Sequence, residues 1–185
     1  MTTDEHPVIA LEIQRAATAS WLPADAEFSR WVAATLAAHR FATQAGTDPE
    51  ARGAGAMTIR LVDLREGIAL NSQWRHKTGP TNVLAFPGPG VHEGPATAVG
   101  SNLPDGAPIE YGDLAICVPV IEREAADQGK QPVCHLAHLV IHGTLHLLGY
   151  THEAENDTER MESLETRILA GFDIRDPYVR NVLLS

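Results

Sequence analysis

Cysteine, basic residues and long apolar runs are all scarce in this sequence, and each shortage narrows what the protein can be. The 185 residues include only two cysteines, Cys117 and Cys134, and the N-terminus has no apolar run of the kind found in an export signal. We therefore expect two reduced thiols and a cytoplasmic protein. No stretch approaches the roughly 20 consecutive apolar residues of a membrane helix, so we expect no membrane partner.

The shortage of basic residues bears on what the protein binds. Lys and Arg number 14 against 24 Asp and Glu, which gives a formal net charge of −10. A protein that holds nucleic acid across a broad face needs many cations to neutralise the phosphates. Composition alone therefore argues against a broad RNA-binding surface. Any contact with nucleic acid has to be local, in a positive cleft built from few residues and a metal, or be helped by a partner.

Length and residue pattern predict one α/β (α+β) domain spanning residues 1–185. Apolar residues make up 44% of the chain and charged residues 21%, as in an ordinary globular protein. Short β-branched or alternating runs predict about four strands in a central mixed sheet, and helices are expected to pack against it. The predicted strands are 8–13, 57–63, 81–87 and 112–118, and the predicted helices are 26–43, 64–74, 119–128, one from about 131 onward, and a last one from about 156.

Three local features refine this outline. Residues 112–118 are the most apolar strand candidate and are expected to be central in the sheet. Residues 88–111 hold nine Gly or Pro in 24 positions, which predicts a long flexible loop. Asn156, followed three residues later by Glu159, has the pattern of a capping box at the start of the last helix.

The helix that begins near residue 131 is rich in histidine. Spacings of 3, 4 and 4 residues place four imidazoles on one helix face, within an arc of about 80°. Leucine, isoleucine and valine surround most of the remaining circumference, so we expect this helix to be largely buried. The four histidines are His135, His138, His142 and His146.

Three histidines in and after this helix form a candidate metal site. His142 and His146 lie one turn apart, the spacing at which two imidazole nitrogens converge on one cation. Gly149 can adopt the left-handed conformation that turns a helix end back on itself, which returns His152 to the same ion. Three neutral nitrogens and an open fourth position are typical of a catalytic zinc. We therefore predict one bound zinc ion.

Other potential ligands lie close by in sequence. Cys134 and His135 are about two helical turns before His142 and are expected to be too distant to share its ion. His138 is one turn away, and it either supports a ligand through a hydrogen bond or belongs to the core. Both interpretations of His138 stay open at this point.

The same histidine spacing occurs in metzincin proteases. There, a glutamate directly after the first histidine is the general base. Gly143 occupies that position here, and glycine can neither accept a proton nor orient water. A metallohydrolase acting on peptides or small molecules is therefore the weaker alternative.

Segments outside the histidine helix add a resemblance to a known family. Residues 142–152 (His-Gly-Thr-Leu-His-Leu-Leu-Gly-Tyr-Thr-His) and residues 74–87 (Trp-Arg-His-Lys-Thr-Gly-Pro-Thr-Asn-Val-Leu-Ala-Phe-Pro) resemble the YbeY family of endoribonucleases, also called ribosomal RNA maturation factors. Residues 58–63, 112–117 and 161–165 match as well, in the family's order. The resemblance thus covers most of the chain from about residue 57 onward.

The resemblance implies a single-strand-specific, metal-dependent endoribonuclease. Its role would be to process ribosomal RNA, notably the three-prime end of the small-subunit RNA, and to act in ribosome quality control. It implies that His142, His146 and His152 are the metal ligands and that Arg75 is the functional arginine. The implied partners are single-stranded ribosomal RNA and, further, the ribosome or its proteins. A metal-binding, ribosome-associated factor that does not cut RNA is another alternative, and the acidic composition favours it.

The residues suit phosphodiester cleavage. Zinc on three imidazoles keeps its full charge and activates water, which either attacks phosphorus or removes the proton of the ribose two-prime hydroxyl. Arg75 can contact two phosphate oxygens at once, although a surface salt bridge is the simpler interpretation without the resemblance. Lys77 is a candidate RNA contact, and His76 and Arg60 either extend its positive patch or are simply solvated.

Two positions qualify the resemblance. The family usually has aspartate before its last histidine, where this chain has Thr151. A carboxylate near the metal is thereby lost, which affects the expected metal affinity. Asn82 either donates to the substrate or caps the turn before its strand.

Overall fold

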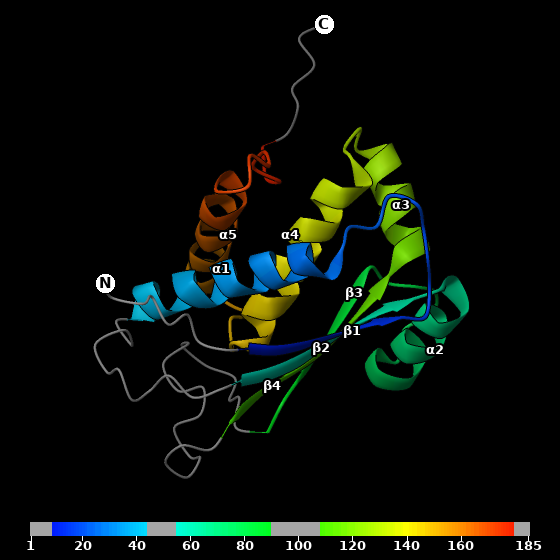
Figure 1. The fold of residues 1–185 in the computed structure, drawn as a ribbon, viewed down its shortest axis with the longest axis horizontal. Coiled ribbons are helices and arrows are strands. Elements are labelled where there is room, and N and C mark those ends of the chain that lie inside the picture. Colours follow the sequence, from blue (N-terminus) through cyan, green and yellow to red (C-terminus); the bar gives the residue numbers. More distant parts are fainter. Residues whose placement is uncertain (1–8, 44–54, 90–107, 180–185) are drawn as a thin grey trace, which may run out of the picture.

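The computed structural model describes residues 9–43, 55–89 and 108–179 (Figure 1). The order of elements in these ranges is strand, helix, strand, helix, two strands and three helices. Their bounds are β1 Ile9–Arg15, α1 Asp25–Thr43, β2 Gly55–Val62, α2 Leu64–Arg75, β3 Val83–Pro87, β4 Ile109–Cys117, α3 Val118–Asp127, α4 Pro132–Leu147 and α5 Glu155–Ala170.

The four strands form one mixed sheet in the order β1-β2-β4-β3. β1, β2 and β4 pair in parallel, while β3 runs antiparallel to β4 at one edge. The predicted class and strand number are therefore confirmed, as is the interior position of β4. Parallel neighbouring strands need a crossover, because a short turn cannot join them. α1 lies between β1 and β2 in the chain, and α2 lies between β2 and β4.

One face of the sheet carries the main core. Figure 1 shows α1, α4 and α5 gathered on the same side of the strands, with α2 on the other side. Met57, Ile59 and Leu61 alternate along β2 toward the helices and are almost completely buried, while the intervening Thr58 and Arg60 are only partly buried. This period of two is the expected signature of a strand whose two faces differ in environment.

α4 lies directly on the sheet, and a glycine permits the contact. A Cβ atom at Gly143 would lie 2.8 Å from Leu114 Cδ2 and 2.9 Å from Leu114 Cδ1, so only glycine fits without displacement. Ten of the 16 residues of α4 are buried, as predicted for this helix. The fold thus fixes the histidine face of α4 at the boundary between the core and the surface.

Two sequence predictions about segment ends are wrong. The predicted loop 88–111 ends earlier, because Ile109 and Glu110 already pair with β2 as part of β4; residues 90–107 lie outside the described residues. The predicted capping box at Asn156 does not form: α5 begins at Glu155 with Ala154 as its N-cap, and no side chain caps it. Glu155 and Asp157 instead place negative charge in the first turn, which favours the positive end of the helix dipole.

No helix within the described ranges has both the length and the apolar character needed to cross a membrane. Cys117 is buried and Cys134 is partly buried, and both are free thiols.

Candidate metal centre

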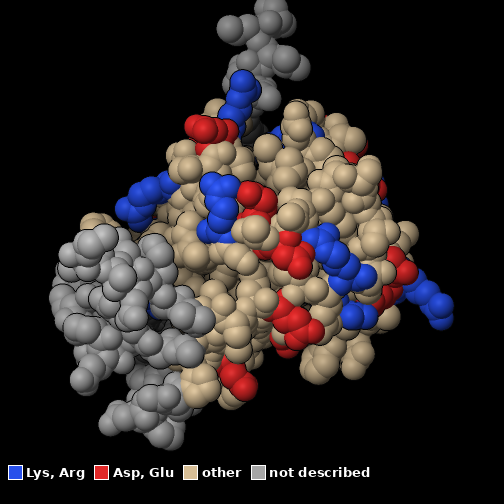
Figure 2. Space-filling model, in the orientation of Figure 1, with Lys and Arg blue, Asp and Glu red and all other residues tan. Residues whose placement is uncertain are grey.

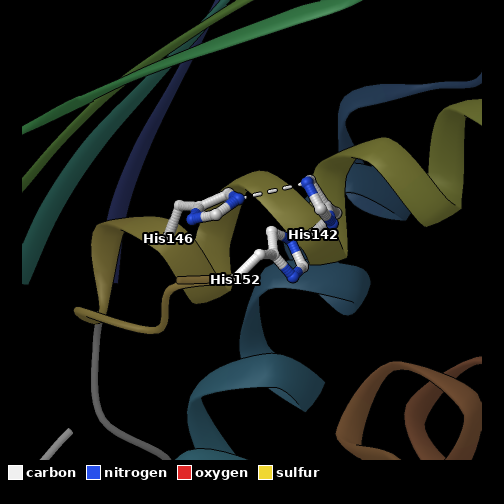
Figure 3. Close-up of side chains that lie close together, drawn as sticks. All are labelled: His142, His146 and His152. Atoms are coloured by element: carbon white, nitrogen blue, oxygen red, sulfur yellow. Dashed lines mark hydrogen bonds between the residues drawn. The ribbon is translucent and has the colours of Figure 1, made fainter. Parts of the chain in front are cut away.

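Three histidines from α4 and the turn after it meet at one point (Figure 3). One ligand nitrogen from each of His142, His146 and His152 lies within 4.8 Å of the others. The ring centroids are 4.6, 5.1 and 5.0 Å apart, so the three imidazoles form a nearly equilateral triangle. The structure therefore brings together all three residues that the sequence predicts as ligands.

The turn after α4 explains how His152 reaches the other two. Gly149 has φ 86°, in the left-handed region that glycine favours. The amide of Tyr150 donates to the carbonyl of Leu145 at 3.1 Å, and the amide of Gly149 donates to the carbonyl of His146 at 3.0 Å. These two bonds define a Schellman motif, which ends the helix and reverses the chain direction. The predicted role of Gly149 is thus confirmed.

Hydrogen bonds on the outer nitrogens fix the tautomers of two rings. Nδ1 of His142 lies 2.8 Å from a carboxylate oxygen of Glu165, and Nδ1 of His146 lies 2.9 Å from the carbonyl oxygen of Tyr150. Both partners only accept hydrogen bonds, so both Nδ1 atoms carry the proton. In the neutral rings the two Nε2 atoms are then bare lone pairs.

These two Nε2 atoms face each other at 3.1 Å, the contact that is dashed in Figure 3. Two bare lone pairs at this distance repel unless a cation lies between them. Nitrogens on a tetrahedral zinc with bonds of about 2.0–2.1 Å are roughly 3.3 Å apart. The donor set, its tautomers and its spacing therefore fit a zinc-like ion.

The electrostatic environment keeps the ligands in their metal-binding form. Burial, together with the neighbouring His142, lowers the pKa of His146 to about 4. Burial and His142 also lower the pKa of His152. Neutral imidazole is the form that binds a metal, so the site is prepared for a cation rather than for protons.

A buried carboxylate that sequence reasoning missed stands behind this site. Glu165 of α5 is 0% exposed and accepts hydrogen bonds from His142, from His138 Nε2 at 3.1 Å, and from the hydroxyl of Tyr178. Burial raises the pKa of Glu165, but these hydrogen bonds outweigh it and lower that pKa to about 2. An ionised carboxylate behind a ligating histidine fixes the orientation of the ring and increases its basicity.

His138, His142 and Glu165 form a second group with atoms close enough to share an ion. Hydrogen bonds already account for each of its short contacts, and Tyr178 occupies the remaining side of the carboxylate. This group is therefore better described as the support of the three-histidine site. His138 thus contacts Glu165, the residue that holds the predicted ligand His142.

Arg75, His142 and His146 line one cleft of about 350 Å³. Arg75 is the last residue of α2, and residues of the edge strand β3 line the same cleft. The other walls are formed by Thr81, Asn82, Val83, Ala85, Pro87, His142, Gly143, His146, Gly149, Tyr150 and Thr151. The two segments that carry the resemblance, residues 74–87 and 142–152, thus meet in space, although they are 55 positions apart in the chain.

The remaining candidates have other surroundings. Arg60 is ion-paired with Glu66 at 2.7 Å in a separate groove, so of its two interpretations the positive patch at the cleft is excluded. Lys77 is exposed in the turn after α2, and is absent from the described residues that line the cleft. Asn82 accepts from the amide of Val83 at 2.7 Å, as expected for a residue that caps this turn.

Cys134 and His135 lie in another part of α4. The Nε2 atom of His135 is 2.7 Å from Glu124. Cys134 and His135 line a different cavity from that of the metal cleft. Neither belongs to a described group of potential metal ligands, as predicted from their distance along the helix.

Charge on the visible surface is mixed. On the face shown in Figure 2, Lys and Arg are interspersed with Asp and Glu and do not gather into one broad basic patch. This agrees with the expectation that any contact with nucleic acid is local. Within the cleft, Arg75 is the cationic side chain among the described lining residues.

Comparisons with known proteins find relatives along most of the chain. A family model described as Endoribonuclease YbeY matches residues 16–173. A protein of Alkalilimnicola ehrlichii named Endoribonuclease YbeY is 47% identical over 179 residues, which cover 95% of this chain and 94% of that protein. One of the same name from Methylococcus capsulatus is 43% identical, covering 92% of this chain and 96% of that protein. A solution structure from Thermotoga maritima is 21% identical with a TM-score of 0.48, covering 92% of this chain and 99% of that one.

Proposed function

The chain belongs to the YbeY family of endoribonucleases, and we propose that it is a zinc-dependent endoribonuclease that cuts single-stranded ribosomal RNA. His142, His146 and His152 hold the ion, and Arg75 binds the phosphate at the cleavage position. The proposed task is ribosomal RNA processing in the cytoplasm, including the three-prime end of the small-subunit RNA, together with ribosome quality control.

One observation carries the proposal: two bare imidazole nitrogens face each other at 3.1 Å in the same cleft as an arginine. Three protein ligands leave the fourth position of a tetrahedral ion for water or substrate. A guanidinium beside that position suits a phosphate, because it is always charged and can contact two oxygens at once. A structural zinc needs neither the open position nor the arginine.

The chain's own side chains divide the work. A bound zinc ion would supply a water molecule of lowered pKa and polarise the phosphoryl oxygens. Arg75 binds the nonbridging oxygens and stabilises the charge that develops on them. Glu165 holds His142 in the correct tautomer and orientation. Gly143 contributes no general base, and its missing side chain lets α4 pack directly on Leu114 of the sheet.

The size of the cleft supports an unpaired substrate. About 350 Å³ lies near the lower end of the range for small-molecule sites, which suits one nucleotide better than a rigid duplex. Arg75 is the one cation among the described residues that line the cleft, so affinity for a long RNA has to come from a few contacts or from the ribosome. Lys77, close to Arg75 in sequence, is a further candidate for an RNA contact, and His138 supports the site through Glu165.

A cleavage assay with three proteins tests the proposal. Zinc-loaded wild-type protein, His146→Ala and Arg75→Ala are incubated with a single-stranded RNA, with the same sequence as a duplex, and with casein. We expect cleavage of the single strand by the wild type alone, with strong loss in both variants. Equal cleavage by all three proteins would indicate a contaminating nuclease and reject the site. Casein cleavage would instead favour a peptidase.

Metal analysis of the same samples separates the two roles. We expect His146→Ala to lose zinc and Arg75→Ala to retain it, because only the histidine contacts the ion. Freshly purified wild-type protein without any bound transition metal would contradict the metal site itself.

A further inference from the structure

The edge strand β3 forms one wall of the metal cleft. Val83, Ala85 and Pro87 line this wall, in the same cleft as Arg75 and His146. Among the described strands, β3 pairs only with β4, so the other side of β3 is a free edge. A free strand edge is a row of hydrogen-bonding groups, and its ligand depends on which of these groups remain open.

The register shows which backbone groups of β3 point away from the sheet. The amide of Cys117 donates to the carbonyl of Asn82 at 2.8 Å, and the amide of Gly88 donates to the carbonyl of Tyr111 at 3.0 Å. In an antiparallel pair, residues that bond to the neighbouring strand alternate with residues that do not. The even-numbered residues of β3 therefore bond to β4, and the backbone groups of the three residues that line the cleft point to the free edge.

Two features leave this edge with one donor and three acceptors. The amide of Val83 already donates to Oδ1 of Asn82 at 2.7 Å, and Nδ2 of Asn82 is held by Glu124 at 3.1 Å. Pro87 has no amide hydrogen. The amide of Ala85 is therefore the one donor left along the described edge of β3. No described group donates to the outward carbonyls of Val83, Ala85 and Pro87.

This pattern is poorly suited to a peptide strand. A peptide that extended the sheet would exchange an amide hydrogen and a carbonyl at alternate residues of β3. Two of the three outward amides cannot take part, because one is capped and one is a proline nitrogen. Such blocked amides are a common protection against strand pairing. The edge instead suits a ligand that needs one donor next to one acceptor.

An unpaired nucleobase is such a ligand. The Watson–Crick edge of each RNA base carries a hydrogen-bond donor next to an acceptor, such as N3–H beside O4 in uracil. Proteins that bind single-stranded RNA form hydrogen bonds to these edges. In an extended strand the carbonyl of one residue and the amide of the second residue after it point to the same side. The carbonyl of Val83 and the amide of Ala85 are such a pair, an acceptor beside a donor.

We propose that the carbonyl of Val83 and the amide of Ala85 bind the Watson–Crick edge of one unpaired base of the RNA. The inference rests on the proposed endoribonuclease function and gives a cause for its preference for single strands. In a duplex this edge is already bonded to the opposite base, so a paired nucleotide cannot make the contact. Because every base carries the required pair of groups, the contact selects unpaired nucleotides rather than one sequence. Arg75, in the same cleft, is available to the phosphate.

Modified oligonucleotides test the contact on the unaltered protein. Labelled hexauridine, and versions methylated at every N3 or at every C5, are titrated with the full-length zinc-loaded protein in brief anisotropy measurements. Methylation at N3 removes the hydrogen that Val83 would accept, whereas methylation at C5 adds the same group away from that edge. We expect N3-methylation to weaken binding by about tenfold and C5-methylation by less than about twofold. Gels of the same samples at later times report cleavage.

Two substitutions at Ala85 test the donor. Ala85→Pro removes the amide hydrogen and preserves the bonds to β4, because this amide points to the free edge. Ala85→Val adds a side chain of similar size and keeps the amide. We expect Ala85→Pro to weaken hexauridine binding by about fivefold and Ala85→Val to change it by less than about twofold. With the N3-methylated oligonucleotide, Ala85→Pro should cost little, because the contact is already lost.

The outcomes separate this contact from the proposed function. Equal binding of the two methylated oligonucleotides, or no binding of hexauridine, would overturn the contact, and cleavage in the same samples would leave the endoribonuclease in place. The expected contrast in binding without cleavage of any RNA would support the contact and reject the nuclease. A capped tetrathreonine peptide that displaces hexauridine would assign the edge to peptides instead. If Ala85→Pro does not fold, the methylated oligonucleotides still decide, because they need no variant.

Discussion

A carboxylate oxygen of Glu165 lies 2.8 Å from Nδ1 of His142, and this carboxylate is completely buried. A charge in such a place is expensive unless it is fully hydrogen-bonded, and three donors surround this one. The helix α5 therefore does more than cover the core: it supplies the group that aims a ligand of the candidate metal site. Its contribution can be measured separately from catalysis.

Replacing Glu165 with glutamine should weaken zinc binding by about 10- to 100-fold. Glutamine keeps the shape of the side chain but lacks the charge that raises the basicity of His142. Its amide can also turn its NH2 group toward Nδ1 of His142, where no hydrogen bond forms because both groups are donors. Competition with a chromophoric chelator measures the zinc dissociation constant. Glu159→Gln, an exposed substitution on the same helix, is the control. An unchanged dissociation constant in a folded Glu165→Gln protein would show that Glu165 serves only packing.

Much of the site could be predicted from sequence because it depends on local spacing. His142 and His146 follow from helix periodicity, and His152 follows from the glycine that reverses the chain. Arg75 could be joined to them only by resemblance, since its place in the cleft depends on how α2 packs in three dimensions and not on local spacing. Glu165 left a signal that was not used: it shares the buried stripe of α5 with Met161, which a solvated glutamate would avoid.

The errors of prediction also have physical causes. Gly and Pro in residues 88–111 indicate a loop, but the tertiary pairing of β2 with Ile109 and Glu110 overrides this local preference. The capping-box pattern predicts Asn156 as the N-cap, but α5 already begins at Glu155 with Ala154 as its N-cap. Glu155 and Asp157 in the first turn favour this earlier start. Helix boundaries depend on such small differences and are less predictable than the helices themselves.

Replacing Arg75 with alanine should lower kcat/KM for RNA by about 100-fold, with no change in zinc affinity. Arg75→Lys should recover only part of the activity, because an ammonium group does not contact two oxygens in the fixed geometry of a guanidinium. Steady-state kinetics on a labelled single strand gives the comparison. Arg65→Ala, exposed on the same helix, controls for loss of positive charge. Similar losses in both variants would point to general electrostatic attraction rather than to phosphate binding in the cleft.

Replacing Gly143 with alanine should destabilise the protein by about 1 to 2 kcal/mol. Alanine normally stabilises a helix interior by about 1 kcal/mol over glycine. Here its Cβ would meet the buried Leu114 at 2.8 Å, so the overpacking outweighs this preference. Urea unfolding of the single variants and of Gly143→Ala/Leu114→Ala forms a double-mutant cycle. The cost of Gly143→Ala should shrink or reverse once Leu114 is truncated; an unchanged cost would contradict the proposed contact.

The stability of the metal-free protein should depend on His39 between neutral and mildly acidic pH. His39 is a buried residue of α1 whose Nδ1 lies 3.3 Å from the hydroxyl of Tyr150. Burial, and to a lesser degree Arg40 and Arg160, lower its pKa from 6.5 to about 4. Below pH 6.5 the unfolded chain therefore takes up a proton that the folded protein refuses. The stabilisation is complete above this pH and is lost as the pH falls toward 4.

Between about pH 7.5 and about pH 5 this single group should remove about 2 kcal/mol of the free energy of unfolding. His39→Gln keeps a polar group near Tyr150 but cannot titrate, so the difference between wild type and variant should shift by that amount. Urea unfolding of both proteins with a chelator present measures it, and the histidines of the metal site cancel because both proteins contain them. Parallel curves for the two proteins would mean that His39 takes up its proton in the folded state, and that its burial does not resist the charge.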